Sequence, residues 1–256
     1  MQFVLRRCQN CIRCKYQLSC DGILQKSLHI IICFKLIFAI RIDFFATRNA
    51  NFAITTISTK CEVKQMYKFF AYLNRMKYIN RWSLMRSTVT ENIMEHSQQV
   101  AVIAHALAMI SNTYFGGNLD ANSIAVKAIF HETSEVITGD LPTPIKYFNE
   151  EIRNSYKALE HYSNQKLLTY LPSELSAKYA NIIDVEKDEE YRYVKYADKI
   201  CAYLKCVDEV NMGNSDFTSA KKTLRKEITE FNSKEVDYFM AHFVEAFSLT
   251  LDDLQS

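Results

Sequence analysis

Residues 128–144 read AIFHETSEVITGDLPTP, a run that joins an apolar helical pattern to a pair of ionisable side chains and then to a turn. Apolar residues recur at helical spacing here, so we expect a helix from a cap at Asp120 to about Ile137. The glycine and two prolines at the end of the run must stop that helix, because proline cannot continue one. Within it, His131 and Glu135 lie four residues apart and would project from one face. The run therefore predicts a helical protein with a polar site on this helix.

The rest of the chain also predicts helices. Five Gly and three Pro in 256 residues are too few for the many turns of a β-sandwich or barrel, and 48% apolar residues are ample for a core. We therefore expect an all-α helical bundle. Apart from the helix around His131, the expected helices lie at about 67–80, 90–110, 150–170, 173–181, 188–210, 216–231 and 233–247.

Two further residues, His96 and Asp198, could join His131 and Glu135 around a metal ion, while Glu132 lies at the edge of the face that His131 and Glu135 share. Asp198 falls in a largely apolar helix, where a buried carboxylate needs a charge partner or a metal. Imidazole nitrogens and carboxylate oxygens from three helices can form a mixed coordination sphere with positions left for water and substrate. Each residue alone would be assigned a structural role, but together they predict a divalent-metal site. The protease pattern His-Glu-x-x-His is excluded, because its last position is Glu135.

Residues 1–65 differ in kind from the rest, with ten basic and three acidic side chains and six of the eight cysteines. We expect an N-terminal extension that is not a folded domain, with Met66 as the biological start. The alternatives are a metal site in the spacing C-x2-C-x2-C-x5-C at residues 8–20 and an Arg-rich transit peptide. No membrane span is expected in the apolar run 28–46, because each of its three charges costs about 2.5–3.5 kcal/mol on insertion.

Residues 66–256 carry 26 acidic and 21 basic side chains. An acidic body offers no broad surface for a nucleic-acid polymer, so small anionic substrates are favoured. Cys201 and Cys206, five apart on an expected helix, are interpreted as buried free thiols in a reducing compartment, which indicates a cytoplasmic protein.

From Met66 to about Leu254, the sequence resembles the bacterial HD-domain 5'-deoxynucleotidases, metal-dependent enzymes that act on deoxyribonucleoside 5'-monophosphates. The resemblance rests on the strings INRW at 79–82, TEN at 90–92, EHS at 95–97, SEV at 134–136, TGDLPTPIKYF at 138–148 and CAYLKC at 201–206. It implies an HD-domain helical bundle over residues 66–256, a divalent cation such as cobalt or manganese, and a homodimer.

The resemblance also implies roles for individual residues. The implied metal ligands are His96, His131, Glu132 and Asp198, and the implied catalytic residues are Glu135 and Arg81. The implied substrate contacts are Arg81, Trp82, His96, Glu132, Asp140, Leu141, Pro142, Thr143 and Asp198. Arg81 would orient the phosphate, since a guanidinium fork suits bidentate contact with its oxygens. Residues 140–143 would hold the sugar and exclude a 2'-hydroxyl.

Glu132 departs from the family pattern, which has Asp after the second histidine. The extra methylene lengthens the arm by about 1.5 Å, whereas metal–oxygen distances tolerate only about 0.2 Å. Glu132 therefore either bends back and still ligates, with lower activity or altered metal preference, or misses the metal. The second case predicts a catalytically impaired protein that binds nucleotide or a partner without efficient turnover. A third interpretation, a structural or membrane-associated protein, rests only on residues 1–65.

Overall fold

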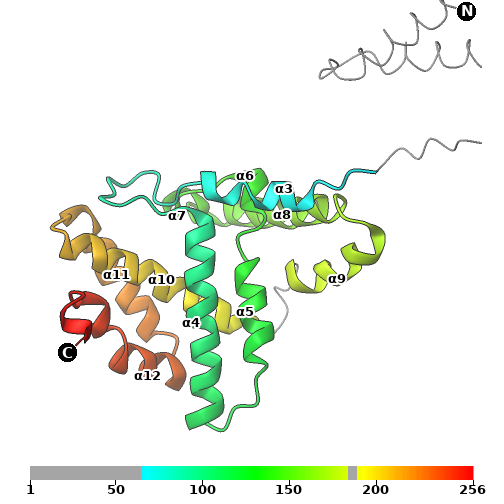
Figure 1. The fold of residues 1–256 in the computed structure, drawn as a ribbon. Coiled ribbons are helices and arrows are strands. Elements are labelled where there is room, and N and C mark those ends of the chain that lie inside the picture. Colours follow the sequence, from blue (N-terminus) through cyan, green and yellow to red (C-terminus); the bar gives the residue numbers. More distant parts are fainter. Residues whose placement is uncertain (1–64, 184–188, 256) are drawn as a thin grey trace, which may run out of the picture. The chain divides into compact units, whose positions relative to one another are not determined.

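The structure is built around one long helix, α4 (Ile93–Tyr114), shown in Figure 1. The computed structural model describes residues 65–183 and 189–255, and the expectations for the N-terminal extension and its cysteines lie outside these ranges. No strand forms in the described ranges. Their other helices are α3 (Phe69–Leu73), η1 (Met76–Tyr78), α5 (Ala121–Ile129), α6 (Glu135–Thr138), α7 (Thr143–Lys146), α8 (Glu150–Leu168), α9 (Ser173–Ile183), α10 (Tyr191–Asn211), η2 (Ser215–Phe217), α11 (Thr218–Thr229), α12 (Lys234–His242), η3 (Glu245–Ser248) and η4 (Asp253–Gln255).

The main hydrophobic core lies around α4, which packs against α5, α10 and α12. Val100, Ala104 and Leu107 of α4 are fully buried, as are Ile200 and Leu204 of α10. Burying a side chain of leucine or isoleucine size stabilises a fold by about 1.5–3 kcal/mol. The predicted all-α class is confirmed, and the packing of α4 on α10 brings residues about a hundred positions apart side by side.

Helix α4 begins at Ile93, two to three residues later than the sequence pattern predicted. Asn92 caps it: the Asn92 side chain accepts hydrogen bonds from the backbone N–H groups of Met94 and Glu95, at 3.0 Å each. Glu95 in turn accepts from the Asn92 N–H at 3.3 Å, which completes a capping box. The residue before the cap, Glu91, stays outside the helix and is free to turn its side chain elsewhere.

The expected single helix from 120 to 137 is wrong, because α5 ends at Ile129 and α6 begins at Glu135. Asp120 does cap α5, accepting from the Ser123 N–H at 3.0 Å. After Ile129, side chains compete for the carbonyl groups that would continue the helix. Thr133 Oγ1 donates to the Phe130 carbonyl at 2.5 Å, and the backbone closes tighter three-residue turns there. His131 therefore lies in a turn, not on a helix face shared with Glu135.

The expected helix at 67–80 is also divided, because its two halves pack against different neighbours. Phe69 of α3 joins a second apolar cluster with Leu167 of α8, whereas η1 packs against α4. The later helices match their predicted ranges to within a few residues, except that the range 216–231 begins with the separate short turn η2 and the range 233–247 ends in the separate short turn η3.

The segment between η1 and α4 is held to the far end of α10. Arg86 makes a bidentate ion pair with Asp216, at 2.8 and 2.7 Å, and the Thr88 N–H donates to Glu209 Oε2 at 2.8 Å. Buried Lys205 donates to Glu209 Oε1 at 2.6 Å. These contacts fix a loop, residues 79–91, that carries Arg81 and Trp82.

Cys201 and Cys206 are both buried and unpaired, as expected. Among the described helices, none combines the length and the apolar character needed to cross a bilayer.

Candidate metal centre and substrate cleft

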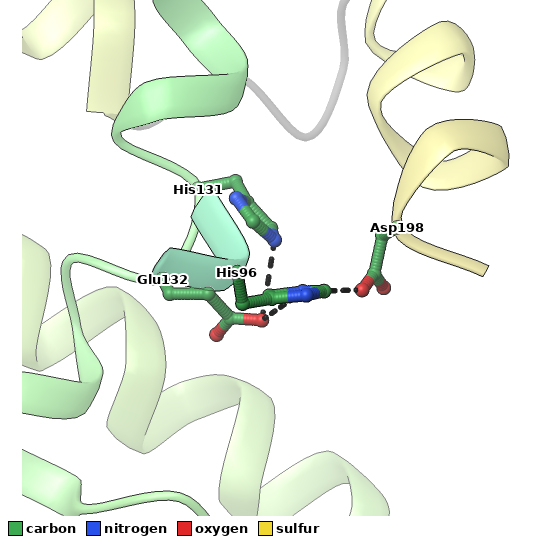
Figure 2. A group of neighbouring side chains, drawn as sticks. All are labelled: His96, His131, Glu132 and Asp198. Atoms are coloured by element: carbon green, nitrogen blue, oxygen red, sulfur yellow. Dashed lines mark hydrogen bonds and ion pairs between the residues drawn. The ribbon is translucent and has the colours of Figure 1, made fainter. Parts of the chain in front are cut away.

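Four side chains from three segments converge on one point (Figure 2). His96 comes from the first turn of α4, His131 and Glu132 from the turn after α5, and Asp198 from α10. One nitrogen or carboxylate oxygen from each lies within 4.8 Å of the others, close enough to hold one metal ion. The predicted ligand set is therefore brought together, although His131 reaches it from a turn.

The two imidazoles present nitrogen atoms to this point. His96 is fully buried, and burial together with the charge of Arg81 lowers its pKa, which favours the neutral, ligating form. His131 Nδ1 lies 2.7 Å from the Ala128 carbonyl, an acceptor, so Nδ1 donates and Nε2 faces the cluster. Burial opposes the charged form of His131, but the neighbouring carboxylates of Glu132 and Asp198 raise its pKa. His131 Nε2 is buried and makes no hydrogen bond, although Glu132 Oε1 lies 3.2 Å away as an ion-pair partner. An orphaned buried nitrogen is costly unless a ligand satisfies it, which fits a metal ion.

The two carboxylates supply negative charge. Burial alone would raise the pKa of Glu132, but His131 at 3.2 Å and the other nearby cations hold it well below the usual range. Asp198 behaves alike: burial opposes ionisation, yet the hydrogen bond with His96 Nε2, at 2.9 Å, lowers its pKa to about 2. Two nitrogen and two anionic oxygen donors suit a divalent transition metal.

Glu135 lies beside this group but outside it. The side chain is almost fully buried, and its Oε2 has no hydrogen-bond partner. Burial, followed by the neighbouring charge of Glu132, raises the pKa of Glu135 to about 11. A cation bound by the cluster would lower the pKa of Glu135 again, and the ionised carboxylate could then act as a base.

A cleft of about 400 Å³ opens in front of the cluster. It is lined by Glu132, Glu135 and Asp198 together with residues from the 79–91 loop, α7, α10 and α11. The predicted substrate residues in its wall are Arg81, Trp82, Glu132, Asp140, Leu141, Pro142, Thr143 and Asp198. His96 is not in the wall, so its predicted contact with substrate stays a prediction.

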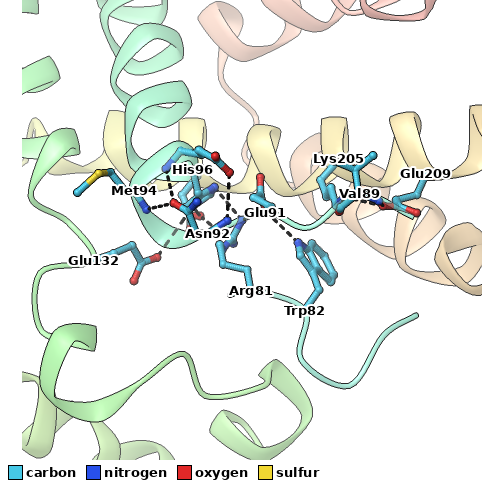
Figure 3. Close-up of polar contacts among 12 residues, drawn as sticks. Arg81, Trp82, Val89, Glu91, Asn92, Met94, His96, Glu132, Lys205 and Glu209 are labelled. Carbon is cyan, nitrogen blue, oxygen red and sulfur yellow. Dashed lines mark hydrogen bonds and ion pairs between the residues drawn. The ribbon is translucent and has the colours of Figure 1, made fainter. Parts of the chain in front are cut away.

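Arg81 lies beside His96 of the cluster, and Trp82 follows it in the cleft wall (Figure 3). Arg81 Nη1 lies 2.7 Å from His96 Nδ1 and 2.8 Å from Glu91 Oε2, and Nη2 lies 3.9 Å from Asp198 Oδ1. Trp82 has a φ of +62°, in the left-handed region, which costs a non-glycine residue about 1–3 kcal/mol. Such strain persists only where surrounding contacts impose it, and it is frequent at functional sites.

A match to a family model covers residues 68–247, and the model describes 5'-deoxynucleotidase YfbR-like proteins. The chain belongs to the YfbR-like 5'-deoxynucleotidase family. It is 51% identical over 188 residues to a 5'-deoxynucleotidase of Erwinia tasmaniensis, covering 73% of this chain and 95% of that protein. It is 53% identical over 188 residues to the 5'-deoxynucleotidase YfbR of Salmonella arizonae, covering 73% and 94%.

Two solved structures share the fold of this YfbR-like chain at about 20% sequence identity. An HD-domain phosphohydrolase from Listeria innocua superposes with a TM-score of 0.63, covering 74% of this chain and 92% of that one. The cyanophage S-2L HD phosphohydrolase DatZ, described as bound to dA and one catalytic Zn²⁺ ion, gives 0.53, covering 73% and 99%. The predicted family and the HD-domain fold are confirmed.

The structure of this YfbR-like protein also brings in residues that the sequence had not singled out. Lys146 lines the cleft from α7 and pairs with Glu160 at 2.8 Å, while Lys199 of α10 and Glu227 of α11 also line it and pair at 2.7 Å. Glu91 binds both Arg81 and Trp82. Lys146 and Glu91 belong to the family strings at 138–148 and 90–92, which suggested that they lie near the site. The sequence did not indicate which residues they would contact.

Proposed function

We infer that this chain hydrolyses deoxyribonucleoside 5'-monophosphates to a deoxyribonucleoside and phosphate. The observation that carries the inference is a cluster of four metal-donor atoms beside a cleft that Glu135 and Arg81 line, in a member of a 5'-deoxynucleotidase family. We propose His96, His131, Glu132 and Asp198 as the ligands of a divalent cation such as cobalt or manganese. The orphaned Nε2 of His131 supports that assignment.

The cation, when bound, would lower the pKa of a water molecule and neutralise phosphate charge. Glu135 Oε2, which faces no other partner, is placed to accept the proton of the attacking water. The water oxygen attacks phosphorus, the bond from phosphorus to the sugar O5' breaks, and O5' leaves with a proton. Arg81 stays charged and offers N–H donors to the phosphate oxygens.

Selectivity for deoxyribose is assigned to residues 140–143. Asp140 is partly buried in the cleft wall, where its carboxylate can accept a hydrogen bond from the sugar 3'-hydroxyl. Leu141 and Pro142 are also in the wall and bring apolar surface to the sugar. A 2'-hydroxyl placed against apolar surface would lose its hydrogen bonds to water, which disfavours ribonucleotides.

Glu132 is proposed to ligate despite its additional methylene. Its Oε1 reaches to 3.2 Å from His131 Nε2 and 4.0 Å from His96 Nε2, so the longer arm folds back into the donor group. We expect the bent arm to leave turnover below that of an aspartate at this position. The alternative is an impaired protein that binds nucleotide or a partner without efficient turnover.

The test is phosphate release from dAMP, dTMP and the corresponding ribonucleotides with cobalt, manganese or magnesium, for the parent and Glu132→Asp. We expect release from the deoxyribonucleotides by both, and faster release by the variant. Glu227→Asp, which shortens a cleft carboxylate outside the donor group, is the matched control and should stay within about twofold of the parent. Release by neither protein would overturn the proposed function, and release by the variant alone would establish the impaired alternative.

We further propose a cytoplasmic homodimer, as the family resemblance implies. The two buried free thiols agree with a reducing compartment. Sedimentation equilibrium should then give about twice the 29.8 kDa chain mass, and cell fractionation should recover the protein without membranes.

A further inference from the structure

Glu91 holds both Arg81, which is assigned to the phosphate, and Trp82, a predicted substrate contact (Figure 3). Its Oε2 accepts hydrogen bonds from Arg81 Nη1 at 2.8 Å and from Trp82 Nε1 at 3.1 Å. The backbones of the two segments are also hydrogen-bonded. The Arg81 N–H donates to the Glu91 carbonyl at 2.9 Å, and an antiparallel bridge joins Asn80 to Asn92. One residue thus fixes the backbone and both side chains of its neighbours.

These contacts leave the Nη2 group of Arg81 without a hydrogen bond in the described structure, on the side that faces the cleft. Both hydrogen bonds of its guanidinium in the described structure use Nη1, while Nη2 lies on the side of Asp198 at 3.9 Å. A carboxylate that binds one edge of a guanidinium fixes the direction of the other N–H groups, because the fork is rigid. Glu91, which binds the Nη1 group, therefore sets the direction in which Nη2 of Arg81 points toward the donor cluster.

Trp82 depends on the same carboxylate. Its left-handed backbone is held while its ring packs 5.4 Å from Phe217 on one side and its Nε1 binds Glu91 on the other. Without the Glu91 contact, the indole would keep only its packing on Phe217 and the Arg81 guanidinium, whose Cζ lies 5.8 Å from the ring centroid. Glu91 itself does not line the substrate cleft but belongs to a separate hollow with Glu95 and Val102.

We propose that Glu91 is a positioning residue that presets Arg81 and Trp82 for the phosphate and the nucleoside without touching either. The proposal rests on the proposed function. Its charge matters as well as its shape, because Arg81 is only 14% exposed and a nearly buried guanidinium needs an anionic partner.

The test replaces Glu91 by glutamine, which keeps the shape and removes the charge. With dAMP as substrate, kcat/KM should fall about 10- to 100-fold, the loss expected for a charged hydrogen bond. Trp82 is the only tryptophan, so fluorescence excited beyond the absorption band of the 15 tyrosines reports on this site alone, and Glu91→Gln should shift its emission and increase quenching by acrylamide. Glu95→Gln is the matched control: it makes the same change four residues later, in the cap of α4, and should leave kcat/KM and fluorescence unchanged.

A double-mutant cycle separates positioning from a purely structural role. If Glu91 acts through Arg81, then Glu91→Gln should cost little further activity in an Arg81→Ala background. An equal loss in both backgrounds would overturn the proposal, as would parent-like kcat/KM and fluorescence in Glu91→Gln. Glu91→Asp, which keeps the charge but withdraws the carboxylate, serves if the glutamine variant does not fold and should show the same loss. If the parent releases no phosphate, the proposed function fails, and the fluorescence comparison still decides whether Glu91 holds Trp82.

Discussion

At the scale of the residue, Glu135 is the clearest test of the assigned chemistry. It faces the cleft but is not one of the four clustered donors, so catalysis and metal binding are separable. We expect Glu135→Gln to lower kcat by about 10²- to 10⁴-fold, the usual contribution of a general base, with bound metal unchanged. Steady-state kinetics and the metal content after dialysis check this.

An unchanged kcat in Glu135→Gln would remove Glu135 from the mechanism, and lost metal would place it among the ligands. Glu132→Ala is the complementary variant. We expect it to weaken metal binding at least about tenfold, since even groups that only support a ligand contribute that much.

The types of the site residues could be predicted from sequence, because His96, His131 and Asp198 carry their chemistry in the side chain. The residues that contact and orient these side chains could not be predicted. Nothing in the spacing of Glu91 from Arg81 reveals a shared hydrogen bond, because the pair meets across a backbone bridge and not along one helix.

At the scale of the element, the break between α5 and α6 explains where periodicity misleads. The apolar pattern continues through His131, yet Thr133 and His131 bind the carbonyl groups of Phe130 and Ala128 and stop the helix. A hydrophobic pattern records which face is buried, but local side-chain bonds to the backbone decide where the helix ends.

The pairing of Lys205 with Glu209 should stabilise the loop that carries Arg81. Both side chains are more than 90% buried, and Glu209 also accepts from the backbone of Thr88. Removing one partner leaves an uncompensated buried charge, so Glu209→Ala should lower the free energy of unfolding by about 3–5 kcal/mol. Urea denaturation measures this.

An exposed pair with the same spacing, Lys226 and Glu230, is the matched control. Glu230→Ala should cost no more than about 0.5 kcal/mol, because water already solvates both charges. Equal losses in Glu209→Ala and Glu230→Ala would contradict the role assigned to burial.

Glu209 should also make the stability of the protein depend on pH. Contacts with Lys205 and the loop hold the pKa of Glu209 far below its ordinary value of 4.5. As pH falls, Glu209 is therefore protonated in the unfolded chain before it is protonated in the folded protein. Its contribution to stability is complete above about pH 4.5 and is lost as pH falls toward the depressed pKa. Melting temperatures measured from pH 6 to pH 3 should fall more steeply for the parent than for Glu209→Gln, and parallel curves would contradict the assignment.

At the scale of the whole molecule, the fold class was predictable but the packing was not. Few glycines and prolines and a steady helical period were enough to predict an all-α body. That α4 lies against α10, which brings His96 to Asp198, follows from complementary apolar faces that no local pattern identifies.

Residues 66–256 should suffice for folding and activity. All the residues assigned to the site lie within them, and the family match begins at residue 68. We expect a protein that lacks residues 1–65 to keep the melting temperature and kcat/KM of the full chain. A large loss of either would show that the extension belongs to the enzyme.

The anchors of the loop that carries Arg81 also set an order of assembly. Arg86 is paired with Asp216, 130 positions later, and Thr88 with Glu209, 121 positions later. During synthesis the loop is made early, but its first partner, Glu209, follows 121 positions after Thr88, and Asp216 follows 130 positions after Arg86. Contacts so distant in sequence form late, because a long stretch of chain must first be ordered. A nascent chain that already contains all four donor residues therefore lacks both anchors of the loop that carries Arg81 until residues 209 to 216 have been made.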